Sequence, residues 1–146
     1  MKASEFIFED KITLRVRYGE TDQMGYVYYG NYAQYFEVGR VEALRNLGIS
    51  YKTMEEEGFM LPVSEYHVKY RFPAKYDDEL TVKTFVVGLS GPRLLFEYEI
   101  FNEDKALVAT AHTTLVFVNK TTMRPTAPPE NFCKMIDNMR SQKHEE

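Results

Sequence analysis

Residues 31–47 read NYAQYFEVGRVEALRNL, and the helix that they predict is the central element of the expected fold. Apolar or small residues recur at helical spacing in this stretch, and polar residues fall between them. The recurring positions are Tyr32, Phe36, Gly39, Ala43 and Leu47. Gly48 is a natural stop, so the pattern predicts a helix of roughly 25 Å at 1.5 Å per residue. Small residues on its apolar side indicate close packing against a sheet.

A strand and a loop are expected before this helix. Residues 11–18, KITLRVRY, alternate between apolar and polar side chains, which predicts a half-buried strand. Its apolar face would carry Ile12, Leu14, Val16 and Tyr18. The next residues, GETDQMG at 19–25, contain two glycines and an aspartate and are typical of a loop.

The chain after the helix is expected to form mainly strands. A short helix over about 51–57 precedes four alternating segments within residues 61–119, which are separated by PAKYDDE, GLSGPR and NEDK. These breaks suit turns between antiparallel neighbours. The proline-marked stretch RPTAPPE then introduces a C-terminal helix over about 129–142. The order predicts one α+β domain, 1–146, in which an antiparallel sheet wraps around the long helix.

Composition narrows the function classes. The 146 residues suit one domain, and a net charge of -4 makes a broad nucleic-acid-binding surface a poor expectation. The single cysteine, Cys133, cannot form an internal disulfide, which favours a reducing compartment. The N-terminal stretch MKASEFIFEDK resembles no secretory signal, and no apolar run approaches the roughly 20 residues of a membrane span. We therefore expect a cytoplasmic protein.

The loop before the helix carries the most suggestive side chains. Asp22 is followed by four tyrosines within residues 26–32. Aspartate is common in loops because it accepts hydrogen bonds from nearby backbone N–H groups, and composition alone favours this structural interpretation. However, free amides at a helix start stabilise negative charge, and bulky tyrosines suit a pocket wall. A carboxylate beside such amides is suited to acyl transfer, and an activated thioester needs no serine triad.

The stretch RVRYGETDQMGYVYYGNYAQYFEVGRVEALRNLGI resembles the 4-hydroxybenzoyl-CoA thioesterase family of hotdog-fold proteins. The similar features are Tyr18, Thr21-Asp22, Gly25, Tyr28-Tyr29, Asn31-Tyr32, Arg40, Glu42 and Leu47-Gly48. The later YRFPAKYDDELTV is similar as well, so the resemblance spans about residues 10–119. It implies a hotdog fold of β-α-β4 order, with a five-stranded antiparallel sheet around one central helix.

The resemblance also implies an activity and a site. Asp22 would be the catalytic carboxylate, as nucleophile or as base for water, and the backbone N–H of Tyr29 would polarise the thioester carbonyl. Several such thioesterases carry His where this chain has Tyr29, which leaves a side-chain role open. Further substrate-binding positions are Tyr18, Gly25, Tyr26, Tyr28, Gly30 and Asn31, together with Lys69, Arg71 and Arg93 for the phosphates of coenzyme A. For the three basic residues, a solvated surface is the competing interpretation.

The implied substrate is an acyl-CoA or acyl-carrier-protein thioester, and coenzyme A would enter as part of that substrate rather than as a cofactor. The family pattern implies a homodimer or a tetramer of dimers with sites at the interface. A non-catalytic acyl-thioester-binding protein of the same fold is the alternative. A hotdog dehydratase would need an Asp/His pair that the sequence does not offer. His67, His112 and His144 have no metal-ligand spacing, so no metal is expected.

Overall fold

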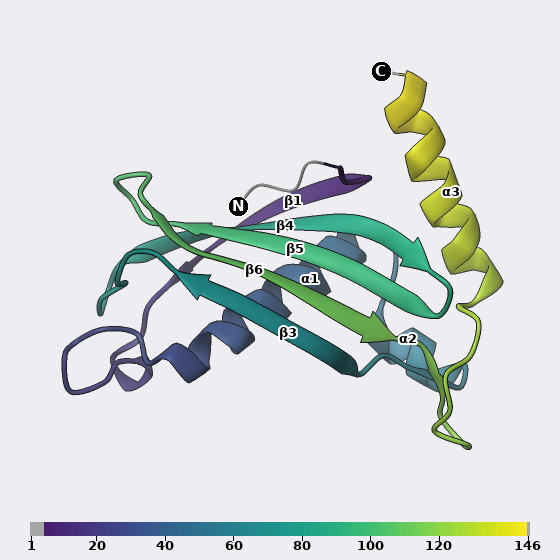
Figure 1. Cartoon of the computed structure of the whole chain (residues 1–146), viewed down its shortest axis with the longest axis horizontal. Helices are drawn as coiled ribbons and strands as arrows, with labels where there is room; N and C mark the ends of the chain where they lie inside the picture. Colours follow the sequence, from purple (N-terminus) through teal and green to yellow (C-terminus); the bar gives the residue numbers. More distant parts are fainter. Residues whose placement is uncertain (1–4, 146) are drawn as a thin grey trace.

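The computed structural model describes residues 5–145 (Figure 1). Residues 1–4 belong to the N-terminal stretch in which no secretory signal was expected, and they lie outside the described residues. A five-stranded antiparallel sheet in the order β1-β4-β5-β6-β3 curves over one long helix, α1. The strands are β1 Phe8–Arg15, β3 Val63–Tyr70, β4 Glu79–Ser90, β5 Arg93–Phe101 and β6 Leu107–Val116. The predicted α+β architecture, a sheet around one central helix, is confirmed.

Helix α1 spans Tyr32–Asn46 and follows a short 3-10 turn, η2, over Tyr29–Asn31. Its buried side includes Tyr35, Arg40 and Leu44 in addition to four of the predicted positions, whereas Leu47 caps the helix and is only partly buried. The predicted close approach occurs at Gly39, where a Cβ atom would lie 2.5 Å from Thr84 Oγ1. A larger residue would therefore push the helix away from β4.

Shorter elements complete the domain. The predicted short helix is α2, Tyr51–Glu56, and the predicted C-terminal helix is α3, Glu130–Glu145. Strands β2, Phe59–Met60, and β7, Val118–Asn119, form a separate pair. In α3, Phe132 and Ile136 are buried, and the Phe132 ring packs on Phe117 at 5.1 Å. No helix within residues 5–145 has the length and apolar character needed to cross a bilayer.

Two details of the predicted strands are wrong. Strand β1 ends at Arg15, and Tyr18 begins a 3-10 turn, η1 Tyr18–Glu20, in which its side chain is 76% exposed rather than buried. In addition, PAKYDDE does not join neighbouring strands, because β3 pairs with β6 and β4 pairs with β1 and β5.

The segment 71–78 is instead a crossover that supports the loop before α1. Its backbone bonds reach residues of the N-terminal part of the chain: Val27 N–H donates to the Ala74 carbonyl at 2.8 Å, and Asp77 N–H donates to the Val16 carbonyl at 3.0 Å. Ala74 is fully buried. The short connection has the composition of a hairpin turn, but its Ala74 carbonyl and its Asp77 N–H bond to residues on either side of the loop that carries Asp22.

Candidate functional site

The carboxylate of Asp22 is held by its own loop. Its Oδ1 accepts hydrogen bonds from the backbone N–H groups of Met24 at 2.9 Å and Tyr26 at 3.2 Å. Asp22 N–H donates to the Tyr26 carbonyl at 2.8 Å, and Gly25, with φ +81°, allows the chain to reverse between them. Within residues 5–145, no hydrogen bond involves Oδ2 of Asp22. The local bonds therefore fix one oxygen and leave the other for a ligand or water.

A second carboxylate, Glu20, lies under this loop and was missed by the sequence interpretation. It is buried, and it pairs with Arg17 at 2.7 Å and accepts a hydrogen bond from the Tyr35 hydroxyl at 2.9 Å. Its backbone carbonyl accepts from Tyr28 N–H and from Asn31 Nδ2, both at 2.9 Å. Glu20 therefore ties the loop to the start of α1. The only signal in the sequence was the i, i+3 spacing of Arg17 and Glu20.

The bonding of Glu20 determines its charge. Burial raises the pKa of Glu20, but the bonds from the Arg17 backbone and side chain and from Tyr35 outweigh it and lower the pKa below its ordinary value. Burial and the Glu20 bond both raise the pKa of the Tyr35 phenol, so it stays protonated. Because its oxygens are already occupied, Glu20 has a positioning role rather than a proton-transfer role.

The start of the helical segment supplies free backbone donors. Tyr28 N–H donates to Glu20, and Asn31 N–H donates to the Tyr28 carbonyl at 2.9 Å. Between them, Tyr29 is the first residue of η2, and its N–H donates to no group of the described residues. Such first-turn N–H groups lack an intrahelical partner and carry partial positive charge. The Tyr70 hydroxyl donates to the Tyr29 carbonyl at 3.3 Å and holds this turn from the β3 side.

One cavity of about 370 Å³ brings the carboxylate and the helix start together. Its lining consists of Asp22, Met24, Tyr26, Val27, Tyr29, Tyr32, Tyr70, Arg71, Phe72 and Pro73. The wall is mainly aromatic and partly open, since Tyr29 is 64% exposed and Phe72 is 49% exposed. Asp22, Tyr29 and Arg71 therefore line one largely apolar space. A carboxylate, a helix-start N–H and a cation are the kinds of group that can position a nucleophile and polarise a carbonyl.

The predicted site residues fall into two groups. Asp22, Tyr26, Tyr29 and Arg71 line this cavity, and Tyr32, for which a core role was favoured, is buried but also lines it. The residues that lie outside the lining are Tyr18, Gly25, Tyr28, Gly30, Asn31, Lys69 and Arg93. Of these, Gly25 and Asn31 shape the loop through the contacts described above.

The remaining predicted positions lie at varying distances from the carboxylate. Tyr18 packs edge-on against Tyr76 at 5.6 Å, and the Tyr28 ring lies 4.6 Å from that of Tyr29. A Cβ at Gly30 would lie 2.7 Å from the Tyr28 ring, so glycine lets this ring fold over the turn. Lys69 pairs with Thr110 in the sheet, and Arg93 begins β5 opposite Val116, beyond the other end of β3.

Two of the three histidines, His67 and His112, lie within the sheet. Among the described residues, no group of three or more His, Cys, Asp or Glu side chains could hold a metal ion. His67 and His112 pair across β3 and β6, and their rings stack at 4.9 Å with an interplanar angle of 7°. Sequence spacing could not show this contact because the two residues belong to strands that are distant in the chain.

Comparisons with known proteins indicate the same group of proteins, thioesterases, over most of the chain. Residues 16–136 match the thioesterase-like superfamily. Acyl-CoA thioester hydrolase YbgC from Escherichia coli O6:H1 is 32% identical over 119 residues, which cover 82% of this chain and 89% of that protein. Acyl-CoA thioesterase YbgC from Haemophilus influenzae is 33% identical over 118 residues, covering 80% and 86%. The solved DHNA-CoA thioesterase from Staphylococcus aureus has a TM-score of 0.88 and 34% identity, with 94% of both chains covered.

Proposed function

The chain belongs to the thioesterase-like superfamily of hotdog-fold proteins, and we propose that it is an acyl-CoA thioesterase whose reactive group is Asp22. The names of its relatives support an enzyme that hydrolyses thioesters. The observation that carries the proposal is that Asp22 and Tyr29, the first residue of η2, line the same cavity. Membership of the 4-hydroxybenzoyl-CoA branch in particular is part of the proposal, since Tyr29 occupies the position that carries His in several acyl-CoA thioesterases.

The proposed chemistry uses two groups of the chain. The unbonded oxygen of Asp22 either attacks the thioester carbonyl or removes a proton from an attacking water. The Tyr29 N–H donates to the carbonyl oxygen as negative charge develops on it. Oδ1 stays fixed by Met24 and Tyr26, so the orientation of the carboxylate is set before the substrate binds. No cofactor is required by this scheme.

The thiol part of the substrate is proposed to be coenzyme A rather than a carrier protein. The relatives from Escherichia coli and Haemophilus influenzae carry acyl-CoA in their names, and the similar Staphylococcus aureus structure is that of a DHNA-CoA thioesterase. Arg71 is the basic residue that lines the Asp22 cavity, so it is the first candidate for a coenzyme A phosphate. Lys69 and Arg93 are candidates for more distant contacts.

We predict that the purified protein releases free thiol from at least one acyl-CoA in a panel of aliphatic and aryl acyl-CoAs. A turnover of roughly 1–10³ per second is typical of an enzyme acting on its own substrate. Thiol release can be followed with a chromogenic disulfide, with an acyl-pantetheine panel as the comparison for recognition of the nucleotide part. Saturable binding of acyl-CoA without thiol release from any member of the panel would favour the non-catalytic binding protein instead.

A homodimer joined through β3 is proposed as the active form. Both β1 and β3 are edge strands, but they differ in protection. Outward residues of β1 include Glu9, Lys11 and Arg15, and charges of this kind discourage strand pairing. Strand β3 carries fewer exposed charges, Glu65 and Lys69, and it also exposes Val63, Tyr66 and Tyr70, with 41–48% of each residue accessible. An antiparallel copy of β3 would cover these side chains and close the open side of the Asp22 cavity.

Sedimentation equilibrium is therefore expected to give at least twice the 17.1 kDa mass of one chain. Tyr66→Lys places a like charge from each subunit at the proposed interface and should shift the protein toward monomer. Thr13→Lys adds the same charge to β1 and should leave the assembly unchanged. A fully active monomer, or dissociation caused by Thr13→Lys alone, would contradict pairing through β3. These measurements also separate a dimer from a tetramer of dimers.

A further inference from the structure

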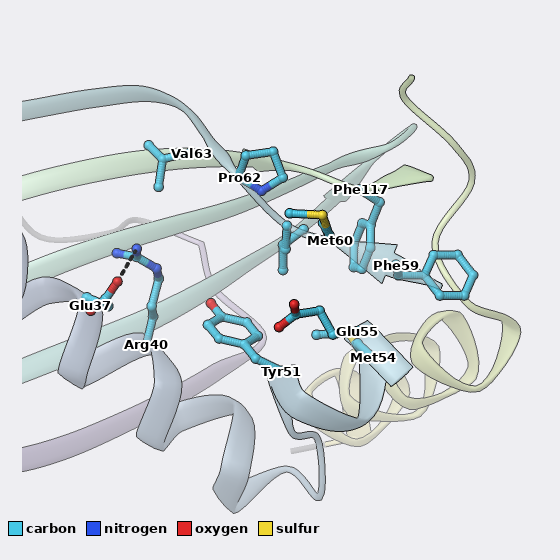
Figure 2. Close-up of a pocket in the computed structure, with 11 residues that line it drawn as sticks. Glu37, Arg40, Tyr51, Met54, Glu55, Phe59, Met60, Pro62, Val63 and Phe117 are labelled. Carbon is cyan, nitrogen blue, oxygen red and sulfur yellow. Dashed lines mark ion pairs between the residues drawn. The ribbon is translucent and has the colours of Figure 1, made fainter. Parts of the chain in front are cut away.

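A second cavity of about 340 Å³ lies near the C-terminal half of α1 (Figure 2). Its apolar lining comes from α2, from the segment that runs from β2 to the start of β3, and from the residue between β6 and β7. It consists of Met54, Phe59, Met60, Leu61, Pro62, Val63 and Phe117. Glu37, Arg40, Tyr51 and Glu55 supply the polar part. Figure 2 shows Glu37 and Arg40 together at one end, with the Tyr51 hydroxyl directed toward that end. The cavity is thus apolar over most of its surface and polar at one end.

Two buried polar groups at this end make no hydrogen bond of normal geometry among the described residues, although the Arg40 side chain interacts electrostatically with the hydroxyls of Tyr51 and Tyr98. Arg40 is only 7% exposed, and within the described residues its Nε has no hydrogen-bond partner. Its closest acid is Glu37, at 3.9 Å from Nη2, and that side chain is 62% exposed. The Tyr51 hydroxyl is buried and also lacks a hydrogen bond of normal geometry. Buried polar groups are nearly always satisfied, so these two point to an interaction that a ligand would supply.

The charges around the cavity define the kind of group that fits. Arg40 pairs with Glu37, and Glu55 lines the same cavity, so a ligand carboxylate would meet two carboxylates and one guanidinium. Burial raises the pKa of Tyr51 to about 12, against the lowering effect of Arg40, and keeps its hydroxyl protonated. An uncharged hydroxyl on the ligand could accept from Arg40 or Tyr51 and donate to Glu37. The apolar lining would hold the carbon skeleton that carries this hydroxyl.

We infer that this cavity receives the part of the acyl group remote from the thioester and that Arg40 and Tyr51 select acyl groups carrying an uncharged hydroxyl there. This inference rests on the proposed thioesterase function and names a substrate class for it. Arg40 and Tyr51 are then specificity residues, distinct from Asp22 and the Tyr29 N–H, which act at the thioester.

The two cavities can meet across the proposed dimer. Within one chain, the contact between Phe36 and Tyr66, with ring centroids 6.2 Å apart, lies between them along α1 and β3. Val63 lines the second cavity at the start of β3, whereas Tyr70 lines the Asp22 cavity at its end. Antiparallel pairing of two β3 strands places the start of one beside the end of the other. The hydroxyl-selecting cavity of one subunit would then adjoin Asp22 of the partner subunit.

The test compares matched linear acyl-CoAs that end in a hydroxyl, a methyl or a carboxylate, each measured as kcat/KM by thiol release. The wild type is expected to prefer the hydroxyl-ended over the methyl-ended substrate by about tenfold, and Tyr51→Phe should remove most of this preference. Tyr51→Phe deletes a hydroxyl that makes no hydrogen bond of normal geometry among the described residues, so its fold is expected to remain intact. The matched control is Tyr35→Phe, which removes a buried hydroxyl bonded to Glu20 and should retain the hydroxyl-to-methyl ratio.

The outcomes separate this inference from the function on which it rests. Thiol release with the same hydroxyl-to-methyl ratio in wild type and Tyr51→Phe would overturn the inference and leave the thioesterase proposal standing. A wild-type preference for the carboxylate-ended substrate would also overturn it, because Glu37 and Glu55 should repel that group. No thiol release from any acyl-CoA would overturn both. A preference for the hydroxyl that is lost in Tyr51→Phe and kept in Tyr35→Phe would establish the assignment.

Discussion

Asp22→Asn is expected to lower acyl-CoA turnover by at least about a hundredfold while leaving the fold unchanged. The asparagine side chain retains an oxygen that can accept from Met24 N–H and Tyr26 N–H, so the loop keeps its two bonds. It lacks a basic, nucleophilic carboxylate, which both proposed routes of thioester hydrolysis require. The measurements are kcat for thiol release and the thermal midpoint followed by circular dichroism.

A matched control for this variant is Asp78→Asn. The Asp78 carboxylate also accepts a backbone hydrogen bond in a turn, from Lys75 N–H at 2.9 Å, but it does not line the Asp22 cavity. Turnover close to that of the wild type is expected for it. Asp22→Asn with near-wild-type turnover would remove the carboxylate from the mechanism, whatever the fold. Turnover lost equally in both variants would indicate a general effect of loop charge.

Local periodicity was sufficient to predict the main elements. The stretch over 31–47 predicted α1, Tyr32–Asn46, to within one residue at each end, because a long apolar stripe at helical spacing has few alternative interpretations. The close approach at Gly39 also followed from residue size alone. The location of Asp22 in a loop between a strand and a helix was predictable for a similar reason, since it depends only on neighbours in the chain.

The order of the strands could not be predicted in the same way. The connection 71–78 has the length and composition of a hairpin turn, yet it is a crossover. The crossover differs from a hairpin turn in the residues to which its backbone groups are hydrogen-bonded. Ala74, for example, bonds to Val27, which lies about 50 residues away in sequence. The rule that sequential strands tend to be neighbours holds often, but it carries no information on such exceptions.

The burial of two charged residues was the other feature that could not be predicted from the sequence. Glu20 and Arg40 are buried, whereas charged side chains are assigned to the surface by any periodicity argument. Glu20 is accommodated because Arg17 and Tyr35 bond to it, and neither contact follows from an apolar pattern. Arg40 lies on the sheet-facing side of α1 beside Tyr51, which belongs to the next helix. Groups of this kind are specified by tertiary contacts: Glu20 ties the Asp22 loop to the start of α1, and Arg40 lines the second cavity.

Tyr29→Pro is expected to lower turnover by about 10²–10³, the typical effect of losing one oxyanion donor. Proline removes the N–H and keeps a φ angle suited to the first residue of a helical turn. The preceding residue, Tyr28, already has φ -62° and ψ 131°, the extended conformation that residues before proline adopt. Because the Tyr29 N–H donates to no group of the described residues, its removal should not cost a structural hydrogen bond. Circular dichroism checks that the variant is folded.

Two further substitutions separate the backbone of Tyr29 from its side chain. Tyr29→Phe removes only the phenol hydroxyl, and Tyr29→Ala removes the ring while retaining the N–H, so Ala is the matched control for Pro. If the N–H is the oxyanion donor, Phe should retain turnover within about tenfold, and Pro should fall well below Ala. The reverse ranking, with Phe inactive and a folded Pro variant active, would assign the reaction to the phenol. The ring is 64% exposed and lies against Tyr28, so the effect of Ala on KM would report its part in the cavity wall separately from the chemical step.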